Sequence, residues 1–185
     1  MARPQTLSDD EVLDRLVDFL NGREGLRAWT LAEAGGAIGL SPAGLLKRFG
    51  SRNGLLAALS TRWVAGIPGS PRRPEDPEGE LAAWVASKAE LEDGRRVPLV
   101  TRLSQLVGDL ADPVLAALLV EGWRRERAYV AALLTAHDLA RLPDPDLAAA
   151  LLLDALTGAG LRSGAGDGAQ AEPQQIFETL MEAWK

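Results

Sequence analysis

Apolar residues recur at helical spacing along almost the whole chain. The first predicted helix covers residues 9–20, and its apolar face consists of Val12, Leu13, Leu16, Val17 and Leu20. Strand signals are nearly absent, because β-branched residues are sparse and no segment alternates convincingly between apolar and polar over five residues. The pattern therefore predicts an all-α fold.

Three further short helices follow, and each begins at a capping residue. Thr30 can cap the second helix, with Glu33 three residues later completing a capping box, and this helix ends at Gly39. The third helix, residues 41–49, opens with a serine as N-cap and a proline at its first helical position. Ser51 caps a fourth helix, which carries a row of apolar residues.

A proline- and glycine-rich segment divides the chain. Residues 66–77 contain four prolines and two glycines, a composition typical of a linker. We therefore expect an N-terminal unit over 1–66, a linker over 67–77 and a C-terminal unit over 78–185. The C-terminal unit is predicted to form helices over 78–93, 97–107, 112–137 and 144–162, then a glycine-rich run over 158–170 and a terminal helix from about residue 172.

Composition excludes several classes of function. With 46% apolar and 25% charged residues the chain has a globular composition, which excludes global disorder. The absence of cysteine excludes disulfides, thiol catalysis and thiolate metal sites, and the single histidine, His137, excludes a zinc site of several imidazoles. We interpret His137 as a packed or surface residue, with catalysis through it as a remote alternative. We expect no enzyme, metal site or cofactor, because the glycine-rich run also lacks the flanking pattern of a phosphate-binding loop.

No targeting or membrane segment is recognisable in the sequence. The first residues lead directly into acidic positions without the apolar stretch of a signal peptide, and no run approaches 18 apolar residues. We expect a cytoplasmic protein with no membrane partner.

The charge distribution differs between the two halves of the chain. The net charge is −6, which by itself argues against a nucleic-acid partner. However, no acidic residue occurs between Glu33 and Glu75, whereas this window contains Lys47, Arg48, Arg52, Arg62, Arg72 and Arg73. Such an asymmetry favours a surface that meets a polyanion, although a chance gap in a solvated surface is an equally open interpretation.

The second and third predicted helices have the layout of a helix-turn-helix. They are joined by a tight turn at Gly39, where a positive φ is often needed. Ala43 and Gly44 are small enough to let the start of the third helix approach a phosphate, and Lys47 and Arg48 are long enough to reach bases or phosphates. Helix–glycine–helix pairs also occur in helical proteins that bind no DNA.

The flanking residues match as well. The order is Thr30, Leu31, Glu33, Gly39, Leu40, Ser41, Leu45, Phe49, Ser51, Arg52, Leu55 and Leu56. Over roughly residues 9–63 this resembles the DNA-binding module of the TetR family of bacterial transcriptional regulators. The resemblance implies a helix-turn-helix head, a helical ligand-binding and dimerisation domain, and a homodimeric repressor. It also implies a double-stranded, palindromic DNA operator and a small organic effector as partners.

By this resemblance, seven residues are predicted to contact DNA. They are Thr30, Ser41, Ala43, Gly44, Lys47, Arg48 and Arg52, of which Ala43, Lys47 and Arg48 are expected to face bases. The chain departs from the family pattern at Ala34, Gly35, Gly44 and Leu46, and the last of these replaces a tyrosine that commonly touches the phosphate backbone. These departures motivate an alternative, a helical binding or adaptor protein that has lost sequence-specific DNA recognition.

The C-terminal unit offers apolar and aromatic helix faces. A cavity for an organic effector could be lined by Trp84, Leu103, Leu106, Leu119, Trp123 and Tyr129, with ordinary core packing as the alternative. An amphipathic terminal helix after a glycine-rich segment needs an apolar partner, and the resemblance implies a four-helix bundle between two subunits. The predicted interface residues are Leu152, Ala155, Leu156, Ala159, Ile176, Phe177, Leu180, Met181 and Trp184.

Overall fold

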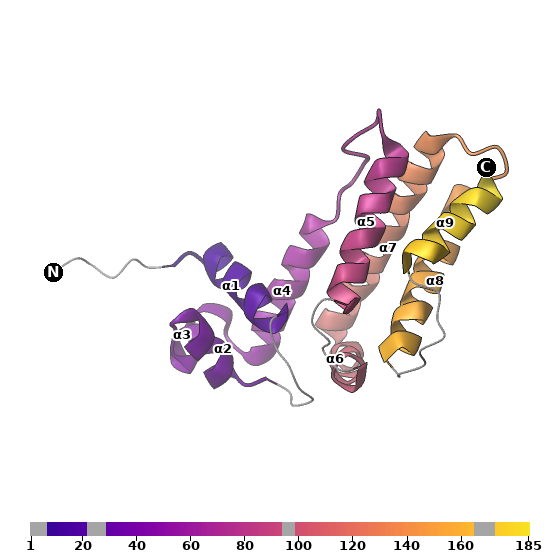
Figure 1. The fold of residues 1–185 in the computed structure, drawn as a ribbon. Coiled ribbons are helices and arrows are strands. Elements are labelled where there is room, and N and C mark those ends of the chain that lie inside the picture. Colours follow the sequence, from indigo (N-terminus) through magenta and orange to yellow (C-terminus); the bar gives the residue numbers. More distant parts are fainter. Residues whose placement is uncertain (1–6, 22–28, 94–98, 165–172) are drawn as a thin grey trace.

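The computed structural model describes residues 7–21, 29–93, 99–164 and 173–185. These residues form helices joined by short connections and contain no strand, so the prediction of an all-α fold is confirmed. The helices are α1 (Asp9–Asn21), α2 (Leu31–Ile38), α3 (Pro42–Phe49), α4 (Arg52–Gly66), α5 (Pro77–Asp93), α6 (Leu99–Ala111), α7 (Pro113–His137), α8 (Pro145–Gly164) and α9 (Pro173–Trp184). Figure 1 shows α1 to α4 gathered at one end and α5, α7, α8 and α9 standing side by side at the other.

We call the described residues up to Gly66 the head. Helices α1, α2, α3 and the first half of α4 enclose one apolar core, because each turns a single apolar face inward. The core residues are Val12, Leu13, Leu16, Ala34, Ile38, Leu45 and Leu55. This shared core thus fixes the position of α3 relative to α2.

The helix ends in the head form as the sequence predicts. Thr30 and Glu33 make the reciprocal capping box, in which the Thr30 N–H donates to the carboxylate at 2.8 Å and the Glu33 N–H donates to the hydroxyl at 3.2 Å. Gly39 adopts the left-handed conformation, with φ of 76°, and ends α2. Ser41 and Ser51 each accept a hydrogen bond from the N–H three residues on, at 3.0 and 2.9 Å.

The two central glycines of α2 have different roles. A glycine inside a helix costs about 1 kcal/mol relative to alanine, so the sequence predicts a weakened helix. At Gly35 a Cβ atom would collide with the carbonyl oxygen of Leu40 in the following turn, whereas at Gly36 a Cβ would find nothing within 4 Å. Gly35 is therefore required by the close approach of the turn, and Gly36 is not.

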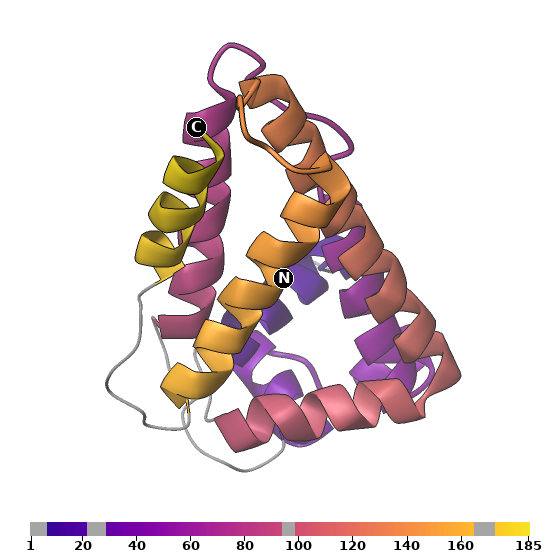
Figure 2. The same ribbon diagram turned by 90° about the vertical axis from the view of Figure 1, so that its right-hand side faces the viewer.

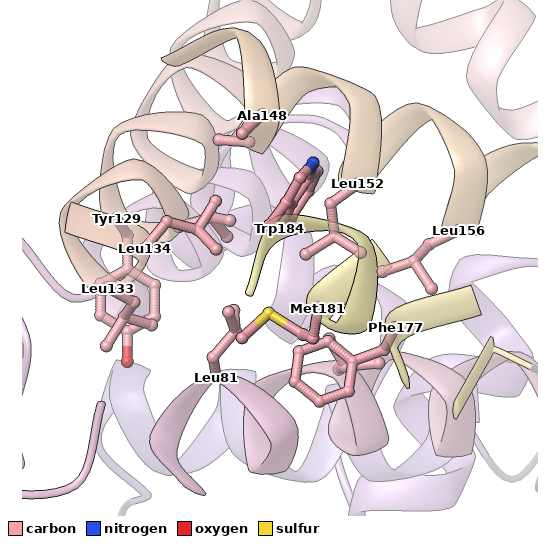
Figure 3. Packing of buried hydrophobic residues seen from close by; sticks show 13 residues of the cluster. Leu81, Tyr129, Leu133, Leu134, Ala148, Leu152, Leu156, Phe177, Met181 and Trp184 are labelled. Carbon is pink, nitrogen blue, oxygen red and sulfur yellow. The ribbon is translucent and has the colours of Figure 1, made fainter. Parts of the chain in front are cut away.

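We call the described residues from Ile67 onward the body. Its core lies between α5, α7, α8 and α9, and Figure 3 shows side chains from these helices pointing toward one another. The largest buried members are Leu81, Leu133, Leu134, Leu152, Leu156, Tyr129, Phe177, Met181 and Trp184. In Figure 2 α6 lies across the end of this bundle, below α7 and α8. Residues 165–172 of the predicted glycine-rich connection, and residues 97–98 of the predicted sixth helix, lie outside the described residues.

Helix α4 joins head and body, because its two ends pack on different parts. The ring of Trp63 occupies the place where a Cβ at Gly122 of α7 would lie, so the absence of a side chain there lets the two helices meet. Arg125 of α7 donates a hydrogen bond to the carbonyl oxygen of Val64 at 3.3 Å. The last turn of α4, which the sequence assigned to the N-terminal unit, thus also packs against α7.

Candidate nucleic-acid interface

Helix α3 buries one face and exposes the other. Leu45 is buried in the head core, which fixes the rotation of the helix about its axis. The opposite face, formed by Pro42, Ala43, Leu46 and Lys47, is exposed to solvent. The exposed face of α3 has the position of the face that the second helix of a helix-turn-helix motif presents to a major groove.

The N-terminal end of α3 is suited to an anion. Its first turn contains no acidic residue, and Pro42 at the first helical position has no N–H to leave unpaired. Ser41 accepts a hydrogen bond from the N–H of Gly44, which leaves the serine O–H available as a donor. Because the helix dipole places partial positive charge at this end, a phosphate oxygen would be favoured there.

Two arginines of the acid-free window are paired with acids from another helix. Arg48 donates to Asp9 of α1 at 2.7 Å, and its side chain is only 21% exposed. Arg62 of α4 contacts Asp10 at 3.1 Å and Asp14 as well. The window contains no acid of its own, but the fold brings α1 carboxylates to it, so much of its positive charge is compensated.

The remaining cations of α3 and α4 differ in their surroundings. The Arg52 guanidinium lies over the Trp29 ring, 4.4 Å from its centroid. Lys47 is exposed, and no ion pair or ring contact joins it to another described residue. Of the predicted DNA contacts, Lys47 is thus the charged side chain best placed to reach a polyanion.

Thr30 is engaged in its own helix cap. Its hydroxyl accepts from the Glu33 N–H and donates to the Glu33 carboxylate at 3.0 Å. A phosphate contact by this hydroxyl would compete with the capping box.

The residues predicted to line an effector cavity do not share one environment. Leu103 and Trp123 are 39% and 47% exposed, whereas Leu106 and Leu119 are half-buried. Tyr129 is buried, and its hydroxyl donates to Glu80. The structure therefore brings Tyr129 to the contact between α5 and α7, near the half-buried Trp84, while Leu103 and Trp123 face solvent.

Sequence reasoning missed two buried carboxylates at this α5–α7 contact. Glu126 of α7 pairs with Lys88 of α5, whose ammonium lies 5.0 Å from the centroid of the Trp84 ring. The only sequence signal for this pair was the helical spacing of Lys88 with Trp84. Glu126 gave no signal, because a single glutamate in a long helix has the pattern of a solvent-exposed residue.

The second buried carboxylate anchors the predicted linker. Glu80 accepts hydrogen bonds from the Arg72 and Arg73 backbone N–H groups, the latter at 2.6 Å, and from the Tyr129 hydroxyl. Burial alone would raise the pKa of Glu80, but these hydrogen bonds outweigh it and hold the pKa below its usual value. Burial, followed by the bond to Glu80, raises the pKa of Tyr129 to about 12.

Most residues predicted to form a dimer interface lie in the core of the single chain. Six of them are buried there, namely Leu152, Leu156, Ala159, Phe177, Met181 and Trp184. Ala155, Ile176 and Leu180 are half-buried. The exposed apolar residues of α8 occupy its opposite face, at Leu147, Leu151 and Leu161.

The histidine and the acidic residues form no cluster of functional groups. His137 Nε2 lies 2.9 Å from a Glu78 oxygen, and this hydrogen bond holds the pKa of Glu78 below its usual value. Among the described residues, no group of three or more His, Cys, Asp or Glu side chains could hold a metal ion. None of the described helices is by itself long and apolar enough to cross a membrane; α6 and α7 pass that criterion only jointly, as a pair bent by 115°.

Comparison with known proteins identifies a similar fold. A solved structure of a candidate transcriptional regulator from Pseudomonas aeruginosa PAO1 aligns with a TM-score of 0.58 and 21% sequence identity. The alignment covers 94% of this chain and 86% of that one. No family model matches the sequence, and no curated protein is significantly similar to it. The chain thus shares its all-α fold with that protein.

Proposed function

We propose that this protein is a DNA-binding transcriptional regulator of the TetR type. It acts as a homodimeric repressor on a palindromic operator and leaves the DNA when a small organic effector binds the body. The observation that carries the proposal is the α2–turn–α3 unit, whose second helix exposes an acid-free N-terminal end together with Lys47. The shared fold with a protein described as a regulator supports it.

The proposed docking follows from the geometry of α3. The exposed face of α3 enters the major groove, and the serine cap with its helix N-terminus meets a backbone phosphate. Lys47 adds a cation, and Arg48 can exchange Asp9 for a phosphate, since its ion pair lies at the protein surface. Binding of this kind depends strongly on salt, because each neutralised phosphate releases counterions.

For the homodimer we propose the outer face of α8. Leu147, Leu151, Asp154, Gly158 and Leu161 alternate at spacings of four and three residues, which places them along one side of the helix. Three of these side chains are exposed leucines, and Gly158 adds no side chain of its own, although the Arg162 guanidinium lies beside it. We propose this face in place of the predicted interface residues of α8 and α9, because the buried residues among them have little surface left to contact a second subunit.

The joint between α4 and α7 supports a link between effector and DNA. An effector bound among the body helices acts on the heads by favouring one position of α4 along α7. At this contact the Trp63 ring packs directly against the backbone of Gly122, which has no side chain to separate the two helices. A small movement of either helix would therefore change the contact. An effector shifts the population between two positions of α4 only if it binds the protein with different affinity in each of them.

The direct test is DNA binding as a function of salt. Duplexes from intergenic DNA beside the gene are titrated with wild-type protein, Lys47→Ala and Arg124→Ala between about 50 and 200 mM salt. Arg124→Ala is a matched control, because it removes an exposed cation from the body. We expect steep salt dependence for wild type and control, and a slope reduced by about one in Lys47→Ala. Failure of the wild-type protein to retard any such duplex at low salt would refute the proposal.

The alternative is a helical adaptor that has kept the fold and lost operator recognition. The ion pairs of Arg48 and Arg62 with α1, and the exposed Leu46 on α3, favour it. It predicts a dimer that retards no DNA at any salt concentration in the same titration.

A further inference from the structure

The exposed face of α3 has an unusual chemistry for a helix that reads DNA. Its four residues are Pro42, Ala43, Leu46 and Lys47, and Leu46 is 40% exposed. Arginine and lysine contact guanine in the major groove, and asparagine and glutamine contact adenine there. Of these residue types only Lys47 belongs to this face, because the Arg48 guanidinium turns toward Asp9. A lysine ammonium is a point charge on a flexible stem and lacks the planar fork with which arginine reads a base edge.

The major groove offers one apolar group for such a face. Thymine alone displays a methyl group there, and small apolar side chains pack against it. Ala43 and Leu46 are three residues apart on α3, which corresponds to a rise of about 4.5 Å along the helix. That distance is close to the step between neighbouring base pairs, about 3.4 Å per strand.

We propose that Ala43 and Leu46 read the 5-methyl groups of thymines in adjacent base pairs, while Lys47 contributes charge without base specificity. This inference rests on the proposed function and specifies the DNA that the head selects. Gly44 supports it, because a helix without a side chain at that position can lie closer to the groove. An exposed leucine is also explained, since its apolar surface is removed from water when DNA binds.

The experiment isolates the methyl group. Full-length protein selects duplexes from a random pool at low salt, and each thymine of the best duplex is then replaced by deoxyuridine, which lacks only that methyl. We expect one or two replacements per half-site to weaken binding about fourfold each, the value for one buried methyl-sized group. Replacement at the remaining thymines should leave the affinity unchanged.

Variants assign the effect to the residues. In Leu46→Ala the uridine replacement at one position should no longer change affinity, and in Ala43→Gly the same should hold at the neighbouring position. Arg124→Ala, on the body, is the matched control and should leave affinity and both methyl effects unchanged. Arg48→Ala should lower the affinity for all duplexes alike and retain both methyl effects. Leu46 lies outside the head core, so Leu46→Ala should fold, which its thermal unfolding curve verifies.

The outcomes separate the inference from the function on which it rests. If no duplex is enriched, the DNA-binding proposal fails and the inference fails with it. If duplexes are enriched but uridine binds as well as thymine throughout, the regulator stands and thymine recognition is refuted. Loss of specificity in Arg48→Ala, together with sensitivity to 7-deazaguanine, would show that guanine is read instead and would also refute it.

Discussion

Head and body keep their charged groups in different places. The described ion pairs of the head, such as Arg48 with Asp9 and Arg62 with Asp10, lie at the surface. The body buries the carboxylates of Glu80 and Glu126 and satisfies them with Tyr129 and Lys88 from facing helices, and Glu80 also with the nearby backbone N–H groups of Arg72 and Arg73. Surface pairs contribute little to stability, whereas a buried charge that loses its partner is costly. The proposed DNA binding would therefore cost the head little when its surface pairs are exchanged for phosphates, whereas losing a buried pair would cost the body more.

The largest expected effect tests the packing of the head turn. Gly35→Ala places a methyl group against the Leu40 carbonyl, so we expect a loss of about 2–3 kcal/mol in the free energy of unfolding. The adjacent Gly36→Ala is the control and should stabilise the protein by up to about 1 kcal/mol. Urea unfolding of the two variants measures both values. Equal effects would mean that the turn is looser than described.

The next effect compares a buried with an exposed ion pair. Lys88→Met leaves the Glu126 carboxylate without its partner, and we expect about 2 kcal/mol of destabilisation, less than for a fully buried pair because Lys88 is 31% exposed. Arg124→Met removes a partner of the exposed Glu121 pair and should change stability by less than about 0.5 kcal/mol. Adding Glu126→Gln to Lys88→Met should recover part of the loss. Thermal unfolding of the four proteins decides the point, and similar losses in both single variants would mean that burial of the Glu126 pair does not distinguish it from an exposed pair of the body.

A smaller effect concerns the pH dependence of the body. The pKa of Glu80 is lowered in the folded protein, so its stabilising contribution is present above the unfolded pKa and is lost as the pH falls through the folded pKa. Glu80→Gln should cost about 1–2 kcal/mol near pH 7, because its acceptors for backbone and tyrosine donors are weakened. Below pH 4 the difference from wild type should shrink. Denaturant unfolding between pH 3 and 7 follows this difference, and a constant gap would show that the charge of Glu80 is irrelevant.

The smallest effect probes the exchangeable pairs of the head. Asp9→Asn removes the charge that holds Arg48 and reduces repulsion of phosphate, so we expect DNA affinity to rise about two- to fivefold at low salt. Asp18→Asn removes one exposed α1 charge that makes no ion pair with another described residue, and it should have less effect. Fluorescence anisotropy with a labelled duplex measures both. An unchanged affinity in Asp9→Asn would mean that Arg48 takes no part in binding.

Features that depend on residues close together in the chain could be predicted from the sequence. The Thr30, Ser41 and Ser51 caps and the left-handed Gly39 were predictable, because each depends on residues at most a few positions apart. The same holds for the all-α class, since apolar periodicity acts within single helices.

Contacts between residues distant in the chain could not be predicted in this way, because they depend on how the helices pack together. The acid-free window predicted a positive surface, yet α1 supplies Asp9 and Asp14 to its arginines, 39 and 48 residues away in sequence. The terminal helices presented apolar faces suited equally to a second subunit and to their own core, and the packing of α5, α7, α8 and α9 buried those faces within one chain. Amphipathicity indicates that a face needs a partner, but the identity of that partner depends on how all the helices share the available apolar surface.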